Sequence, residues 1–256
     1  DNYEQLDSDS NFEVHKTLES STVLVYNKAE GICTDVNFRK AIQATLNMEE
    51  LMTAGYASSD FYRLNSCDML EEQVDWYTDA GSKYYNMQDL KLAKDYLDKS
   101  DYDGKSVKIL CSSDFADTVA IATVLQEQLK EIGVKTKIEQ YDFATFLNCA
   151  NDPSSGDIIV ATYAPVMVPS MILYMSPESG GWYNDDYVQK SIADISSSTD
   201  KKKAFKIWED LQKYNYAETA AYSKLGECYS YSVSSANLEN MGTFQAPTFM
   251  NATLYK

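Results

Sequence analysis

The side chains that most often carry out catalysis are scarce in this sequence. It contains one histidine, His15, which lies in a polar N-terminal segment that we expect to be frayed. A Ser–His or Cys–His pair, or a histidine-based metal site, would have to use this residue alone. No stretch matches the phosphate-binding loop, the dinucleotide-binding loop or the nucleophile elbow. The sequence therefore predicts a protein that is not an enzyme and that carries no cofactor or metal.

Acidic residues are plentiful, but their spacing singles out no catalytic pair. The chain has 39 Asp and Glu against 22 Lys and Arg, which gives a formal net charge of −17. The run from Asp101 to Gly104 looks like half of a calcium loop. Lys99 stands at the first ligand position, however, and no glutamate stands at the twelfth. We therefore interpret these carboxylates as solvated surface and the Asp-Gly pair as a turn.

The cysteines are odd in number and widely spaced. No C-x-x-C pair occurs, so a zinc site or a dense disulfide scaffold is not indicated. We expect small buried apolar side chains, and the sequence leaves open whether the thiols are free. The five positions are Cys33, Cys67, Cys111, Cys149 and Cys228.

Composition excludes further classes. A nucleic-acid-binding protein needs a basic face, which a chain of net charge −17 does not offer. No apolar run approaches the roughly 18 residues that a membrane-spanning helix requires. Residues 1–11 are polar and acidic, so no signal peptide opens the sequence. The chain is expected either to be cytoplasmic or to come from an exported protein whose signal lies outside it.

Hydrophobic periodicity predicts alternating strands and helices, which is typical of an α/β fold with a mixed sheet flanked by helices. Residues 56–86 show no clear period and predict a long surface loop with at most one short helix. The strands are expected over residues 22–26, 106–111, 134–138, 157–163 and 229–233. The helices are expected over residues 36–54, from an N-cap at Asn86, from Asp117 to Gly133, and over 142–148, 185–195 and 200–217.

Four segments, in this order, resemble family 5 of the bacterial extracellular solute-binding proteins, the oligopeptide-, dipeptide- and nickel-binding receptors of ABC importers. Residues 25–27 and 35–42 (VYN, then DVNFRKAI) look like the crossover strand and the following helix of the family. Residues 85–104 contain YN, AKDYL and YDG at the family's spacing. Residues 125–134 (LQEQLKEIGV) match its helix-to-strand turn, and residues 203–212 (KAFKIWEDLQ) its late helix.

The resemblance implies a periplasmic-binding-protein type II fold, of which this chain carries the C-terminal part. Full-length members are about twice as long. Residues 28–218 would form the second lobe, residues 1–27 a hinge strand and first-lobe remnant, and residues 219–256 the return hinge strand and a further remnant. The segments 23–26 and 229–233 should then be neighbouring extended strands. In the family, hinge closure traps the solute between the two lobes.

The sequence departs from the family at the position that anchors a peptide. Peptide-binding members carry a tryptophan and an aspartate after the central strand, and the aspartate pairs with the N-terminal ammonium of the peptide. Here Thr162 takes the place of the tryptophan and Pro165 that of the aspartate, while Pro169 matches a later proline. A further departure reads Thr-Leu-Asn-Met at residues 45–48. Since proline carries no charge, we expect binding that does not depend strongly on a free amine.

The ligand-binding candidates cluster after the central strand, because open α/β sheets bind ligands at the carboxyl ends of their strands. Aromatic and methionine side chains in these loops are equally suited to packing the lobe. The candidates are Thr162, Tyr163, Pro165 and Met167 on the strand-end loop, Trp182, Tyr183 and Asn184 on the next loop, and Phe143 beside them.

The resemblance also implies partners and a location. The ligand would be a peptide or another small solute, the membrane partner an ABC permease, and the protein a monomer without nucleic acid. It would act outside the cell, as a membrane-anchored lipoprotein or in the periplasm. The alternative is a solute-binding lobe reused as a signalling or protein-interaction domain. A lipid-attachment cysteine and a first lobe upstream would favour the importer.

Overall fold

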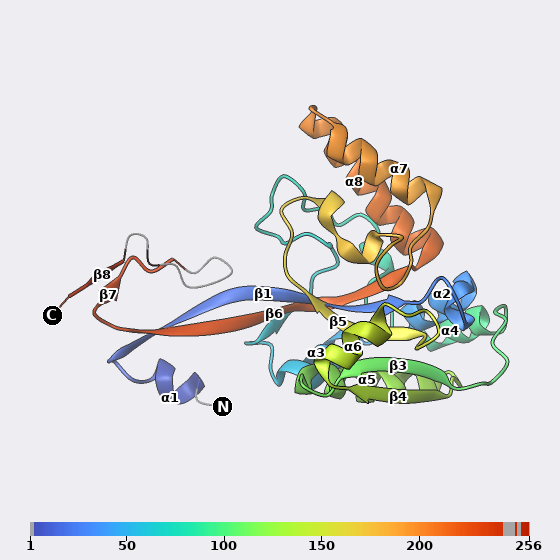
Figure 1. The fold of residues 1–256 in the computed structure, drawn as a ribbon, viewed down its shortest axis with the longest axis horizontal. Coiled ribbons are helices and arrows are strands. Elements are labelled where there is room, and N and C mark those ends of the chain that lie inside the picture. Colours follow the sequence, from blue (N-terminus) through green and yellow to red (C-terminus); the bar gives the residue numbers. More distant parts are fainter. Residues whose placement is uncertain (1–2, 243–248, 250–251, 256) are drawn as a thin grey trace.

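A mixed six-stranded sheet organises the molecule (Figure 1). The computed structural model describes residues 3–242, 249 and 252–255. The strands of the main sheet are β1 (Phe12–Tyr26), β2 (Tyr62–Arg63), β3 (Val107–Ser112), β4 (Thr136–Tyr141), β5 (Ile158–Tyr163) and β6 (Tyr222–Ser235). Their order is β2-β6-β1-β5-β3-β4. β1 is antiparallel to β5 and β6, whereas β3 is parallel to β4 and β5.

Helices cover both faces of this sheet. The α-helices of the described residues are α1 (Tyr3–Asp7), which lies apart from the main body of the sheet (Figure 1), and α2 (Val36–Thr45), α3 (Met48–Tyr56), α4 (Leu90–Leu97), α5 (Ala116–Glu131), α6 (Phe143–Ala150), α7 (Asp186–Ser197) and α8 (Lys201–Tyr214). A small second sheet pairs β7 (Leu238–Glu239) with β8 (Thr253–Leu254). No helix among the described residues is long and apolar enough to cross a membrane.

The strand alternation divides the core into two layers. Leu24 and Tyr26 of β1 belong to the cluster that packs against α2, α3 and α5. Their neighbours Val23 and Val25 belong to the cluster that contains Trp208 of α8. Successive side chains of a strand point to opposite faces, so one buried strand serves both layers. The predicted α/β fold with a mixed sheet flanked by helices is confirmed.

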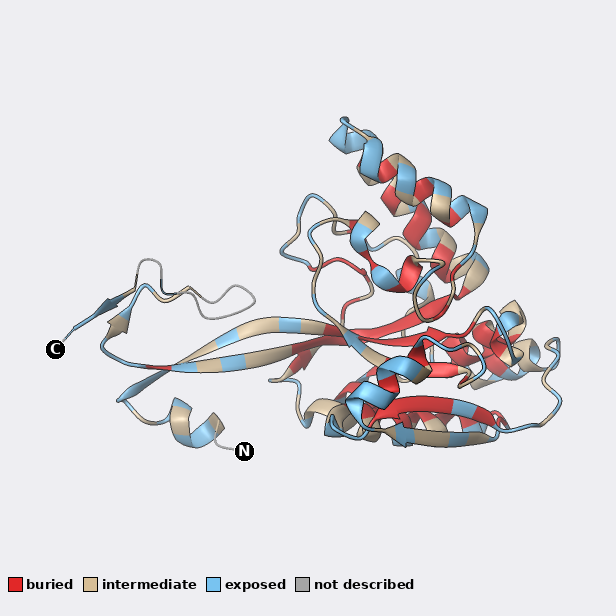
Figure 2. Cartoon of the chain, viewed as in Figure 1, coloured by how far each residue is buried: buried red, intermediate tan, exposed pale blue. Residues whose placement is uncertain are grey.

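β1 and β6 form a long ribbon that leaves the sheet and carries both chain ends away from it (Figure 1). The prediction that segments 23–26 and 229–233 lie on neighbouring strands is confirmed, but the two segments are not opposite each other, since Val25 pairs with Tyr222 and Val14 with Val233. The ribbon is buried where it crosses the sheet and alternates between partly buried and exposed residues beyond it (Figure 2). The strand begins at Phe12 rather than Thr22, so His15 is not frayed. Its Nε2 lies 2.8 Å from Ser234 Oγ on the paired strand.

Two helix predictions were wrong, and asparagine side chains explain both. The expected helix over residues 36–54 is divided into α2 and α3, because the Asn47 side chain accepts a hydrogen bond from Glu50 N and starts a new helix. Asn86 does not cap α4. It adopts a left-handed φ of 54° and its Oδ1 accepts from Met48 N, while Asp89 caps α4. The helix starts predicted at residues 142, 185 and 200 are confirmed, and Asp142, Asp185 and Asp200 are the N-caps of α6, α7 and α8.

Candidate ligand-binding site

The carboxyl ends of β3 and β5 meet at one edge of the sheet, because the two strands are parallel neighbours. β3 ends at Ser112, and α5 begins four residues later. β5 ends at Tyr163 and continues into an irregular loop. Two adjoining cavities open at this edge, and they share Tyr163 and Leu173 as lining residues. This edge is where open α/β sheets bind their ligands.

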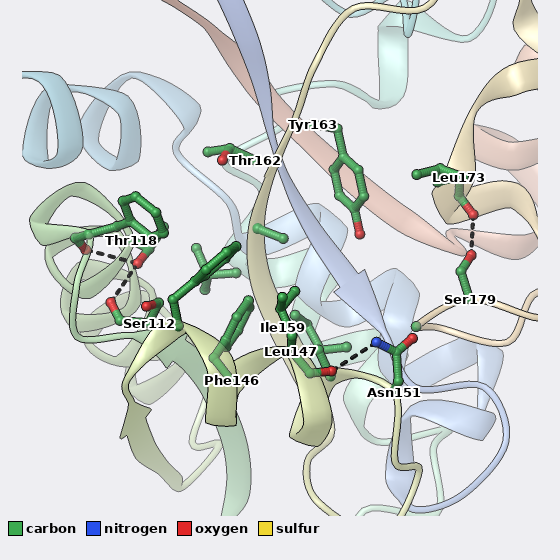
Figure 3. A pocket seen from close by; sticks show the side chains of 16 residues that line it. Ser112, Thr118, Phe146, Leu147, Asn151, Ile159, Thr162, Tyr163, Leu173 and Ser179 are labelled. Carbon is green, nitrogen blue, oxygen red and sulfur yellow. Dashed lines mark hydrogen bonds between the residues drawn. The ribbon is translucent and has the colours of Figure 1, made fainter.

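The first cavity has a volume of about 320 Å³ and is lined mainly by apolar side chains from α6, β5 and the start of α5 (Figure 3). The Phe115 and Phe143 rings meet edge to face, with centroids 5.2 Å apart. Phe146 follows, 6.4 Å from the Phe143 centroid. Phe115 and Phe143 remain 45% and 42% exposed. Clustered exposed aromatic rings mark binding surfaces in soluble proteins.

Polar groups around this first cavity are positioned by local hydrogen bonds. The Thr118 hydroxyl donates to the carbonyl oxygens of Ser112 and Phe115, at 3.1 and 2.9 Å. Asn151 Nδ2 donates to the carbonyl oxygen of Leu147 at 2.8 Å. The threonine oxygen and the asparagine carbonyl retain acceptor capacity. The cavity therefore offers an apolar body with a few oriented polar atoms, as small-molecule sites do.

The second cavity has a volume of about 300 Å³ and contains a buried carboxyl group. Its lining residues include Ser21, Asp68, Tyr163, Pro165 and Tyr174. The hydroxyl of Tyr174 donates to Asp68 Oδ1 at 3.0 Å. The Tyr163 and Tyr174 rings lie 5.0 Å apart in an edge contact. Burial raises the pKa of the Tyr163 hydroxyl to about 12, so it is a neutral hydroxyl at pH 7.

A third cavity, of about 660 Å³, lies at the opposite end of β5 and is lined by Trp182, Tyr183 and Asn184 together with Lys28 and Arg39. The Lys28 backbone N–H donates to the carbonyl oxygen of Gly181, just after β1 ends. Tyr26 pairs with Ile158, whereas Ser21 pairs with Tyr163. Five residues of strand, roughly 16 Å, therefore separate this cavity from the carboxyl end of β5.

The structure thus brings together only part of the predicted site. Thr162, Tyr163 and Phe143 line the first cavity, and Tyr163 and Pro165 line the second. Met167 is 65% exposed and lines neither of them. The three residues on the loop after Gly181 line the third cavity. Tyr183 is almost fully buried there, and its hydroxyl donates to Asn215 Oδ1 at 2.7 Å.

Several lining residues were missed by the sequence analysis. Phe115 follows β3 directly, so the rule that ligands lie at strand carboxyl ends would have found it. Phe146 and Leu147 are reached from Phe143 by helical spacing on α6. Asp68 lies in the segment without periodicity, where no sequence signal points to it. Among the described residues, no group of three or more His, Cys, Asp or Glu side chains is placed to hold a metal ion.

Solved structures of solute-binding proteins share this fold. The oligopeptide-binding protein AppA from Bacillus subtilis, in complex with a nonapeptide, aligns over 100% of this chain and 55% of its own, with 20% identity and a TM-score of 0.81. DppA from Helicobacter pylori, in complex with the peptide STSA, aligns over 100% of this chain and 51% of its own (19% identity, TM-score 0.80). NikZ from Campylobacter jejuni, in complex with Ni(L-His), aligns over 96% and 52% (17% identity, TM-score 0.77).

The chain spans about half the length of these structures. No curated protein sequence matches it. The sequence model described as bacterial extracellular solute-binding proteins, family 5 middle, matches residues 1–184, which is more than half of the chain. The chain therefore belongs to family 5 of the bacterial extracellular solute-binding proteins.

Proposed function

We propose that this chain supplies the second lobe of the substrate-binding component of an ABC importer, which captures a peptide or another small solute between two lobes. The observation that carries the proposal is the pair of adjoining cavities at the carboxyl ends of β3 and β5, lined by partly exposed aromatic rings. The relatives solved with a nonapeptide, a tetrapeptide and a nickel–histidine complex set the range of ligand classes.

The lobe itself comprises residues 28–218, and the ribbon is the hinge. Residues 1–27 and 219–256 then supply the two hinge strands and a remnant of the first lobe; of these, residues 1–2, 243–248, 250–251 and 256 lie outside the described residues. The outer half of the ribbon supports this assignment, because Phe12, Tyr231 and Val233 are 38–43% exposed there. Apolar side chains on a protruding ribbon suit a surface that a first lobe covers.

The protein acts by binding and release, with no chemical step. Its partner is the membrane permease of the importer, to which the loaded monomer delivers solute from outside the cell, either from a lipid anchor or from the periplasm. The net charge of −17 argues against nucleic acid as a partner. The contacts to ligand come first from Phe143, Thr162, Tyr163 and Pro165, and Met167 is exposed on the loop after β5. The third cavity, with Trp182, Tyr183 and Asn184, lies away from this edge.

A thermal-shift screen of the protein with both lobes tests the proposal. Peptides of two to nine residues, sugars and nickel–histidine chelates are each added in excess. A ligand that binds only the folded state at 100 times its dissociation constant stabilises it by about 2.7 kcal/mol, which raises the melting temperature by several degrees. A shift with at least one of these classes is the expected result. A signalling or interaction domain would show none with any of them.

A further inference from the structure

The carboxylate of Asp68 is buried at the lobe edge without a cation beside it. Asp68 is only 8% exposed and lines the second cavity. Its Oδ1 accepts from Tyr174 and its Oδ2 accepts from the Tyr222 hydroxyl, at 3.0 and 2.6 Å. Within the described part of the chain, no lysine, arginine or histidine nitrogen lies within the 4.0 Å that defines an ion pair with it.

Lys224, the cation whose charge acts on Asp68, already forms an ion pair with another carboxylate. Lys224 Nζ lies 2.6 Å from Glu227 Oε1 and also donates to the carbonyl oxygen of Cys67. Glu227 Oε2 in turn accepts from Arg63 Nε at 2.5 Å. Burial raises the pKa of the Asp68 carboxyl above its usual range, while the Tyr222 hydroxyl and the charge of Lys224 act against the rise. An isolated buried carboxylate is costly, so a cation that reached it would be bound favourably.

The second cavity supplies the rest of an ammonium site. A carboxylate has room for about four hydrogen bonds, and the two tyrosine hydroxyls use two of them. Tyr163 and Tyr174 line the same cavity, and the face of a tyrosine ring attracts a cation. Leu173 and Met171 give it apolar walls. Tyr163 and Leu173 are shared with the first cavity, so a ligand body bound there can extend a polar end to Asp68.

We propose that the second cavity binds the primary ammonium group of the solute, with Asp68 as its counter-ion and Tyr163 and Tyr174 as its aromatic walls. This inference rests on the proposed function for its biological ligand, although the cavity itself lies wholly within this chain. The ligand class is a primary amine attached to an apolar body, and a peptide N-terminus or a free amine would both meet it. It replaces the expectation, based on Pro165 alone, that binding does not depend strongly on a free amine.

The first test uses this chain and a matched pair of probes, 2-phenylethylamine, which is protonated at pH 7, and neutral 2-phenylethanol. We expect the amine to bind in the millimolar range by NMR titration and the alcohol at least 10-fold more weakly. Asp68→Asn should abolish this preference, whereas Asp75→Asn, which removes an exposed surface carboxylate paired with Lys201, should preserve it. Failure of the amine to bind at 10 mM, or a preference that Asp68→Asn leaves unchanged, would overturn the proposal.

A second variant guards against a folding defect in Asp68→Asn. Tyr163→Leu leaves the carboxylate and its two hydroxyl donors in place but removes one aromatic wall. We expect it to weaken amine binding about 3-fold or more while binding of the alcohol changes less, because the face of the tyrosine ring attracts the cation and not the neutral alcohol. If Asp68→Asn unfolds, equal losses for both probes in Tyr163→Leu would contradict the proposal.

A second experiment, on the protein that carries both lobes, determines whether the bound amine is a peptide N-terminus. A peptide and its N-acetylated form are compared by calorimetry. A loss of about 100-fold or more on acetylation, which is the scale for leaving one member of a buried ion pair alone, identifies the peptide terminus. Peptide binding that acetylation does not change would exclude the peptide terminus and leave a free amine as the ligand of the site, without contradicting the importer. If this chain binds the amine but the two-lobed protein binds no peptide, the amine site is supported and the proposed peptide importer is contradicted.

Discussion

Phe143 is the side chain through which the first cavity can be probed with least damage to the fold. It is the first residue of α6 and is 42% exposed, so its ring is not needed to fill the core. We expect Phe143→Ala to weaken binding of a peptide identified in the screen by about 5- to 30-fold, as loss of an aromatic contact of about 1–2 kcal/mol would. Calorimetry on the two-lobed protein measures it.

Tyr187 provides the matched control for this substitution. It is also 42% exposed and lies on α7, where its ring packs at 4.6 Å from Tyr214 and lines none of the cavities described above. Tyr187→Ala should leave the affinity within a factor of about two. Equal losses in both variants would show that the first cavity has no special part in binding.

The raised pKa of Asp68 also predicts how the stability of the protein depends on pH. Its pKa is raised in the folded protein, chiefly by burial, so folding favours the protonated form. Stability from this group is fully present below the unfolded-state value near 3.9 and is lost as the pH rises through the higher folded-state value. Asp68→Asn removes this loss. The melting temperature of the variant minus that of the parent chain should therefore rise between about pH 4 and pH 7, and a falling difference would contradict the assignment.

At the scale of elements, a buried ion pair joins β6 to β2 and to the loop that carries Asp68. Lys224 and Glu227 are both on β6 and have fully buried side chains. Glu227 also accepts from Arg63 on β2 and from Asn65 Nδ2, at 2.5 and 2.7 Å. Lys224 donates to the carbonyl oxygen of Cys67, next to Asp68. The network therefore fixes the loop of the second cavity against β6 of the ribbon.

Breaking this pair should be strongly destabilising. Glu227→Gln keeps the shape of the side chain but leaves the Lys224 ammonium buried without a carboxylate, which costs about 3–5 kcal/mol. Urea unfolding measures the change. The double variant Lys224→Met with Glu227→Gln removes both charges and should recover more than half of the loss. A single-variant cost under about 1 kcal/mol would show that the pair does not hold the loop.

Local signals in the sequence predicted most helix starts and all the central strands. Asp142, Asp185 and Asp200 each precede their helix directly, and a side-chain cap acts over two or three residues, so it can be predicted from neighbours alone. The break at Asn47 was missed because apolar spacing continues across it from Ile42 to Leu51. Asparagine favours caps over helix interiors, but hydrophobic periodicity alone does not report this preference.

The site was predictable only where it follows the strands. Thr162 and Tyr163 are the last residues of β5, and their position at the lobe edge follows from the strand itself. Asp68 meets its partners across 106 and 154 residues of sequence, a distance that no local pattern spans. Trp182 was grouped with Tyr163 because Tyr163 ends β5 and Trp182 lies in a loop that follows it. The chain between them returns along the sheet, so the two residues line separate cavities.

At the scale of the whole molecule, the lobe and the ribbon have different surfaces. The sheet and its helices bury two apolar clusters of their own, which suits a unit that holds its shape. The ribbon leaves this core, and its outer half is a mixture of partly buried and exposed residues (Figure 2). The cavities lie at the edge of the lobe rather than inside it. A ligand resting there would keep one side in water until a second lobe closed over it.

The central claim is therefore that two lobes close over the ligand, and a comparison of binding affinities with one lobe and with both tests it. Small-molecule sites bury about 70–90% of the ligand surface, and one lobe supplies about half of such an enclosure. If a closed cleft binds a peptide with about −8 kcal/mol, a single lobe that provides half of this binds with a dissociation constant near 1 mM instead of 1 μM. Calorimetric titration of this chain and of the two-lobed protein with the same peptide compares them directly. The account predicts an affinity at least 100-fold weaker for this chain, and equal affinities would contradict it.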